Sequence, residues 1–81
     1  MRLHRLTLAD DFFESVKVGQ KRFAIRLDDR NYSPGDLLMF HRVVDGVMSS
    51  EAVGPYCITY LLKDWLDGLC DGYCAFSFEC L

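Results

Sequence analysis

The sequence predicts a mainly β protein with one or two short helices, an α+β class in which the strands form a small barrel. Short stretches of alternating apolar and polar residues are separated by polar turns that contain Gly, Pro, Asn or Asp. Only one stretch shows clear helical spacing of its apolar residues. Five or six short strands favour a closed barrel over a sandwich, because closure removes unpaired strand edges.

Length and composition indicate a single domain over residues 1–81. The chain has 81 residues, of which 51% are hydrophobic, so it is near the lower size at which one core suffices. The sequence contains no run of 18 apolar residues, and its first residues lack the apolar segment of a signal peptide. A cytoplasmic protein without a membrane partner is therefore expected.

Two elements are expected before residue 20, a short strand and then a helix over residues 11–18. Asp10 is the expected N-cap of this helix, and Gly19 the residue that ends it. Acidic residues come early in the helix and Lys17 comes late, the order that the helix dipole favours. The expected apolar residues are Leu3, Leu6 and Leu8 in the strand, and Phe12, Phe13 and Val16 on the core side of the helix.

The next strand, over residues 21–26, is expected to carry opposite chemistry on its two faces. Phe23 and Ile25 alternate along it and are expected to form its apolar face. The other face would then present Ala24 and up to three cations, an array that suits a phosphate or a carboxylate. A basic strand face that only water contacts is the alternative. The cations are Lys21, Arg22 and Arg26.

The remaining elements follow from turn signals and alternation. Pro34-Gly35 is typical of a type II turn, and Asp45-Gly46 of a tight hairpin. The expected order is a long turn over 28–35, a strand over 37–40, a hairpin around 45–46, loops or an irregular edge at 49–51 and 54–55, a strand over 56–62, a short helix or loop over 63–70, and a last strand over 72–80.

The cysteines and histidines do not match a metal site. Cys57, Cys70, Cys74 and Cys80 have no common zinc-ligand spacing, and only two histidines are available to join them. Free thiols are expected, with no metal and no cofactor.

Charge is unevenly distributed along the chain. The net charge is −3, which argues against a protein that coats nucleic acid through bulk electrostatics. Residues 1–30 contain seven Lys or Arg against five Asp or Glu, whereas residues 31–81 contain two against seven. A local basic site in an acidic molecule is consistent with this distribution.

The pattern Gly19-x-Lys21-x-x-Ala24-x-Arg26 resembles the Gly-x-Lys-x-x-Glu-x-Arg signature of ASCH domains, in the PUA-like superfamily. The resemblance covers nearly the whole chain and includes features of a small uncharacterised branch that is often carried by phages and bacteria. It implies a β-barrel with a helix against a cleft that binds RNA or modified nucleotides. The flanking matches are His4-x-Leu6, Phe13, Val16, Asp29-Arg30-x-Tyr32-x-x-Gly35-Asp36-x-Leu38, Asp45-Gly46, Ile58-Thr59-Tyr60-Leu61 and Asp71-Gly72-Tyr73.

The chain also resembles a bacterial branch of these proteins that hydrolyses N4-acetylcytidine, with two departures. Ala24 stands where that branch has Thr and where binding members have Glu. The segment that carries the catalytic Glu of the hydrolases is shorter here, and neither Asp64 nor Asp67 aligns with that Glu. Lys21 alone is retained among the three catalytic positions, which favours binding over catalysis.

Three functions follow as hypotheses. The first is an RNA- or nucleotide-binding module in which Lys21, Arg26 and Arg30 contact phosphate or base edges, while Tyr32 or Phe40 stacks a base. In a structural alternative, Arg26 pairs with Asp28, Asp29 or Asp36 and only ties the long turn to the strand.

The second hypothesis is an amidohydrolase of acetylated nucleosides with Lys21 as its reactive group. The third is a small, phage-encoded factor that docks on a host protein through Trp65 and Leu66. These two residues lie among the acidic residues of the C-terminal half, which are Asp64, Asp67, Asp71 and Glu79. In the alternative to that reading, Trp65 caps the barrel and the acidic residues are simply solvated.

Overall fold

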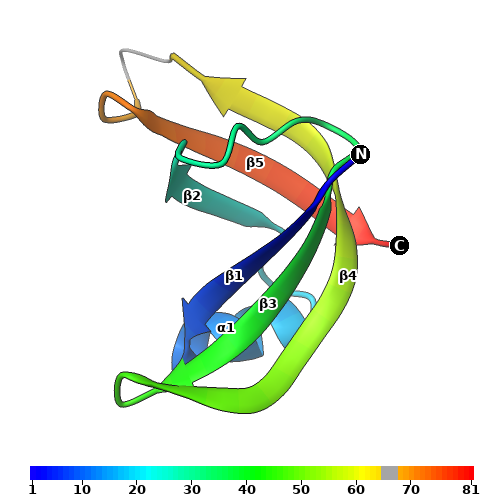
Figure 1. Ribbon diagram of the computed structural model, residues 1–81, viewed down its shortest axis with the longest axis vertical. Helices are drawn as coiled ribbons and strands as arrows, with labels where there is room; N and C mark the ends of the chain where they lie inside the picture. Colours follow the sequence, from blue (N-terminus) through cyan, green and yellow to red (C-terminus); the bar gives the residue numbers. More distant parts are fainter. Residues whose placement is uncertain (65–67) are drawn as a thin grey trace.

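The computed structural model describes residues 1–64 and 68–81, and in these residues one helix and five strands follow one another along the chain (Figure 1). The mainly β prediction is confirmed. The elements are β1 (Leu3–Ala9), α1 (Asp10–Lys17), β2 (Phe23–Leu27), β3 (Leu37–Val44), β4 (Val47–Lys63) and β5 (Tyr73–Cys80).

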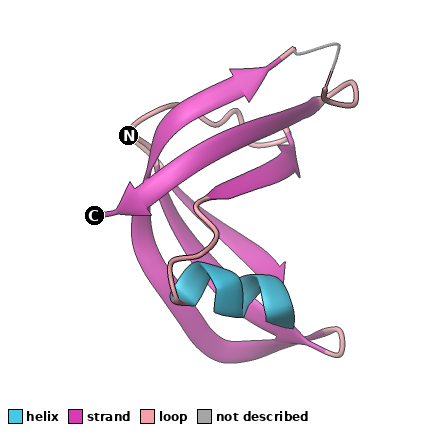
Figure 2. Cartoon of the chain, turned by 180° about the vertical axis from the view of Figure 1, so that it is seen from behind, coloured by secondary structure: helices cyan, strands magenta, loops and turns pink. Residues whose placement is uncertain are grey.

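The five strands form one mixed sheet in the order β1-β3-β4-β5-β2. β1 pairs with β3 in parallel, and the other neighbours are antiparallel. The sheet curves strongly but stays open, with β1 and β2 as its two edges (Figures 1 and 2). The expected closure is therefore not found. Instead of pairing with β2, β1 accepts hydrogen bonds at its backbone carbonyls from the side chains of Arg26 and Arg30.

The core lies on the concave side of the sheet. α1 packs against β1 and β3 there (Figure 2) and buries Phe13 and Val16, as expected. The expected core position of Phe12 is wrong, because its side chain is 54% exposed. An aromatic cluster fills the rest of this side, with the ring centres of Phe40 and Phe78 5.3 Å apart. The core residues are Leu6, Leu8, Phe13, Val16, Ala24, Tyr32, Leu38, Phe40, Tyr56, Ile58, Cys74, Phe76 and Phe78.

Arg42 of β3 fixes the start of α1 to the sheet. Its guanidinium pairs with Asp10 and lies 3.1 Å from the Glu14 carboxylate and 3.2 Å from that of Glu51 on β4. The expected capping role of Asp10 is wrong, because Ala9 is the N-cap residue and no side chain caps the helix. The Asp10 carboxylate serves the ion pair with Arg42 instead.

The face assignment of β2 is the main correction to the sequence prediction. Ala24 is only 3% exposed, whereas Phe23 and Ile25 are 53% and 58% exposed. β2 pairs with β5 so that Ala24 is opposite Phe76, whose ring already fills the concave side. Ala24 belongs to the core on this side, so the alternating apolar pair faces outward.

β4 is longer than predicted, because it continues through both segments that were expected to be loops. Residues 49–51 and 54–55 belong to the strand, and the irregularity takes the form of register shifts against β3. At Gly54, where φ is +133°, an added Cβ would lie 2.7 Å from the carbonyl oxygen of Leu38. A residue with a side chain would therefore keep β4 from approaching β3 this closely.

The two predicted turns are confirmed. The N–H of Asp36 donates to the Ser33 carbonyl across Pro34-Gly35, and Asp45-Gly46 connects β3 to β4. The last strand is also confirmed. The segment expected as a helix or loop over 63–70 includes residues 65–67, which lie outside the described residues, as do the predicted roles of Trp65, Leu66 and Asp67.

Candidate functional site

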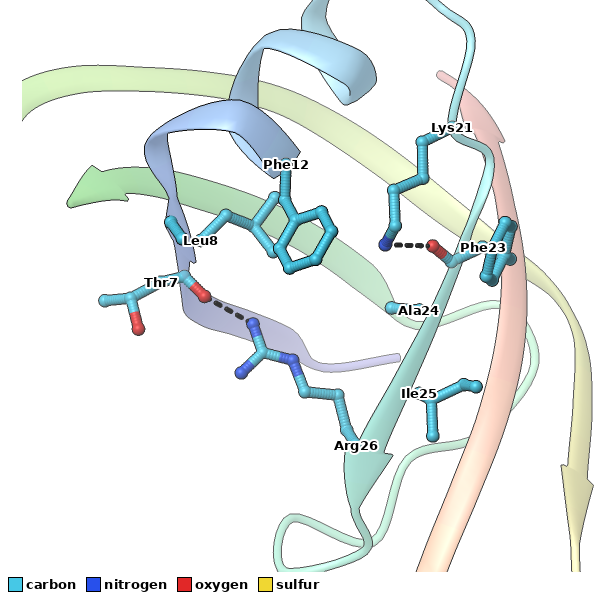
Figure 3. A pocket seen from close by; sticks show the side chains of 9 residues that line it. Thr7, Leu8, Phe12, Lys21, Phe23, Ala24, Ile25 and Arg26 are labelled. Atoms are coloured by element: carbon cyan, nitrogen blue, oxygen red, sulfur yellow. Dashed lines mark hydrogen bonds between the residues drawn. The ribbon is translucent and has the colours of Figure 1, made fainter. Parts of the chain in front are cut away.

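A pocket of about 430 Å³ lies between the end of β1, the start of α1 and the edge strand β2 (Figure 3). We call it the seam pocket, because it occupies the gap between the two edges of the open sheet. Its only charged lining residues among those described are Lys21 and Arg26. The lining residues are Thr7, Leu8, Ala9, Phe12, Lys21, Phe23, Ala24, Ile25 and Arg26.

Lys21 enters the pocket from the loop between α1 and β2. Its ammonium group donates a hydrogen bond of 2.8 Å to the carbonyl of Phe23 and lies 5.3 Å from the ring centre of Phe12 and 4.8 Å from that of Phe23. Partial burial lowers the pKa of Lys21 below its ordinary value, and the positive charge of Arg26 lowers it further. The ammonium therefore has one fixed partner and lies beside a second cation.

Arg26 comes from the inward face of β2 and crosses to the opposite edge of the sheet. Its guanidinium donates to the backbone carbonyl of Thr7 on β1 (Figure 3). Within the described chain, none of the ion pairs joins Arg26 to Asp28, Asp29 or Asp36. The alternative in which Arg26 pairs with one of these aspartates is therefore wrong, although Arg26 does join β2 to β1.

Arg30 lies next to this pocket rather than in it. It donates a 3.1 Å hydrogen bond to the Arg5 carbonyl and lines a smaller hollow of about 140 Å³. Because Arg26 and Thr7 line both spaces, the hollow adjoins the seam pocket. The structure thus brings Lys21 and Arg26 together in the seam pocket and places Arg30 in the adjoining hollow.

Neither aromatic residue predicted to stack a base has a free ring face. Tyr32 is 2% exposed and lies between His4 and Phe76, with ring centres 4.8 and 5.0 Å away. Its burial also raises the pKa of its hydroxyl. Phe40 is completely buried in the core. The stacking roles assigned to Tyr32 and Phe40 are therefore wrong.

Two other aromatic residues line the seam pocket and were missed in that role. Phe12, on α1, is 54% exposed, and its ring points into the pocket, whereas Phe23 borders it from β2 (Figure 3). The sequence does contain a signal for Phe12. One turn of helix cannot bury both members of the Phe12-Phe13 pair on the same narrow stripe.

The described residues contain no group of three His, Cys, Asp or Glu side chains arranged to hold a metal ion. The single helix among them is too short to cross a membrane. Cys74 is buried, which raises the pKa of its thiol, whereas Cys70 and Cys80 are exposed.

Comparison with known proteins gives a family and a phage relative. The model of a family described as a domain of unknown function (DUF3850) matches residues 3–78. An uncharacterised 12.9 kDa protein in the GpA 3′ region of Escherichia phage P2 is 36% identical over 67 residues. The aligned part covers 82% of this chain and 62% of the phage protein, so the chain spans less than two thirds of that relative.

Proposed function

The chain belongs to the DUF3850 family, domains of unknown function, and from the seam pocket we propose that it binds single-stranded RNA or a single nucleotide. The observation that carries this proposal is the convergence of Lys21, Arg26 and the exposed ring of Phe12 on one pocket, with Phe23 at its border. We also propose that this open, curved sheet is a variant of the ASCH-type, PUA-like fold in which the seam pocket is the ligand cleft.

The pocket has the size and the chemistry for one nucleotide. Its volume of about 430 Å³ lies within the roughly 300–1,000 Å³ typical of small-ligand sites. Bases that are not paired stack on aromatic side chains, and Phe12 offers a partly exposed ring in the pocket. Lys21 and Arg26 supply positive charge for a phosphate, with Arg30 available to a second phosphate along the seam.

Selectivity among bases is expected to be weak. Ala24 occupies the pocket between Lys21 and Arg26 and has no polar side-chain atom to read a base edge (Figure 3). Stacking and phosphate contacts, which every nucleotide offers, then dominate the affinity. Ala24→Glu should sharpen base preference more than it raises affinity, because a carboxylate also repels phosphate.

Amide hydrolysis is the second candidate function, favoured by the lowered pKa of Lys21. The described lining residues, however, include no carboxylate or histidine to act as a general base, and Thr7 provides the only hydroxyl side chain. An absorbance assay with N4-acetylcytidine separates the two functions. Turnover that Lys21→Ala abolishes would replace the binding proposal with catalysis.

Titration of short single-stranded RNAs and mononucleotides against three proteins tests the proposal. Lys21→Ala should weaken binding at least tenfold, since a charge-assisted contact contributes about 1.5–3 kcal/mol. Lys17→Ala removes the same charge from the end of α1, outside the pocket, and should leave the affinity nearly unchanged. The difference between the variants should shrink as salt is raised. Equal binding by all three proteins would contradict the proposal.

A further inference from the structure

The convex side of the sheet exposes large apolar side chains on β2, β5 and β4. Residues paired across strands point to the same side of a sheet, and the register aligns Phe23 with Ser77 and Tyr60, and Leu27 with Tyr73. We call this surface the outer apolar face. Its large exposed residues are Phe23, Ile25, Leu27, Tyr60 and Tyr73, which are 53%, 58%, 50%, 66% and 41% exposed.

No element of the described chain covers this face. α1 packs on the concave side, against β1 and β3. A sheet with one solvated side normally alternates apolar residues inward and polar residues outward, and β2 reverses that rule. Its inward residues are Ala24 and Arg26, whereas its outward residues are three large apolar side chains. Apolar patches of this kind on a sheet mark an interaction surface.

We propose that the outer apolar face packs against the same face of a second copy of this chain, forming a symmetric dimer. The described residues paired across β2, β5 and β4 in the outward-facing rows between Phe23 and Leu27 carry no charge, and the Lys21 ammonium lies at the edge of this face, 4.8 Å from the Phe23 ring centre. Sheets that pack face to face about 10 Å apart are a standard way to bury apolar surfaces.

The area is sufficient for such a dimer. A large side chain offers about 150–250 Å², so five that are about half exposed offer roughly 500 Å² per copy. Two copies then bury about 1,000 Å², which is near the lower bound for a specific interface. The proposed dimer is accordingly weak, and its population should depend on protein concentration in the micromolar range.

Sedimentation velocity over a series of concentrations tests the proposal. The wild-type protein should shift from 9.3 kDa to twice that mass as concentration rises. Ile25→Asp on β2 and Tyr60→Lys on β4 each place a charge in the interface and should raise the dissociation constant at least tenfold. Two variants on different strands distinguish loss of the interface from local damage to β2, and circular dichroism checks that both fold.

Val47→Asp is the matched control, because Val47 is 68% exposed in the β3–β4 hairpin, away from this face. Its dimer should be as stable as that of the wild type. A wild-type protein that stays monomeric at all concentrations would overturn the proposal. So would a dimer that survives both face variants, or one that Val47→Asp disrupts equally, since either would place the contact elsewhere.

Discussion

The imidazole Nε2 of His4 lies 2.8 Å from the carboxylate Oδ2 of Asp36, and both side chains are buried. The same carboxylate accepts hydrogen bonds from the backbone N–H groups of Arg2 and Ser33, at 3.1 and 3.2 Å. Asp36 therefore joins the beginning of β1 to the turn that precedes β3. β1 and β3 are the parallel pair of the sheet, and two parallel strands cannot be connected by a short hairpin.

Asp36→Asn should destabilise the protein by roughly 1.5–3 kcal/mol, because it removes the charge and one of the two acceptor oxygens from a buried group with three hydrogen-bond partners. Urea denaturation at neutral pH measures this free energy of unfolding. Asp45→Asn, in the exposed hairpin turn, is the matched control and should be nearly neutral. Equal losses in the two variants would show that the Asp36 contacts contribute little.

The stability contributed by Asp36 should disappear in acid. Burial opposes ionisation of this carboxyl, but hydrogen bonds from His4, Arg2 and Ser33 outweigh burial and hold its pKa below the ordinary 3.8. The contribution is thus complete above 3.8 and is lost as pH falls through the lower, folded-state pKa. The difference in unfolding free energy between wild type and Asp36→Asn should narrow over that range. A constant difference would contradict the assignment.

Phe13→Ala should cost about 3–5 kcal/mol, since Phe13 is 1% exposed between α1 and the sheet. Phe12→Ala, one residue earlier, should cost about 1 kcal/mol or less, because that ring points into the seam pocket. Denaturant titration of both variants compares them directly. If the pocket binds a base, Phe12→Ala should weaken binding without this loss of stability.

Gly54→Ala should be more destabilising than Gly35→Ala. Both glycines have positive φ, so both substitutions strain the backbone by roughly 1–2 kcal/mol. At Gly54 the new methyl group would also lie 2.7 Å from the Leu38 carbonyl oxygen and 2.9 Å from Met39 Sδ, whereas no atom lies within 4 Å at Gly35. Thermal unfolding should rank the variants in this order. The opposite rank would mean that β3 and β4 separate easily.

Much of the fold was predictable because its signals are local. The Phe13 face of the helix, the two turns and the last strand follow from spacing and turn residues alone. The side of β2 that faces inward was not predictable, since strict alternation is equally regular in both orientations. The orientation of β2 follows from the pairing of Ala24 with Phe76 on β5, and these two residues are far apart in the sequence.

The same distinction applies to the site. Lys21, in the loop before β2, and Arg26, on β2, belong to the motif that resembles the ASCH signature, so their assignment to one site was predictable, although a separation of five residues places them out of phase in strand alternation. The stacking residues were not, because the burial of Tyr32 depends on His4 and Phe76 from two other strands. The hydrogen bond from the Arg26 side chain to the Thr7 carbonyl, which joins the two edge strands, likewise has no local signal in the sequence.

Mapping backbone amide shifts during titration with a short single-stranded RNA tests nucleotide binding in the seam pocket most directly. The largest shifts should fall on Phe12, Lys21, Phe23 and Arg26, with smaller ones at Arg30. They should weaken together as salt is raised, because charge supplies much of the affinity. Shifts confined to Tyr60 and Tyr73 on the convex side, or no shifts at millimolar RNA, would contradict the proposed function.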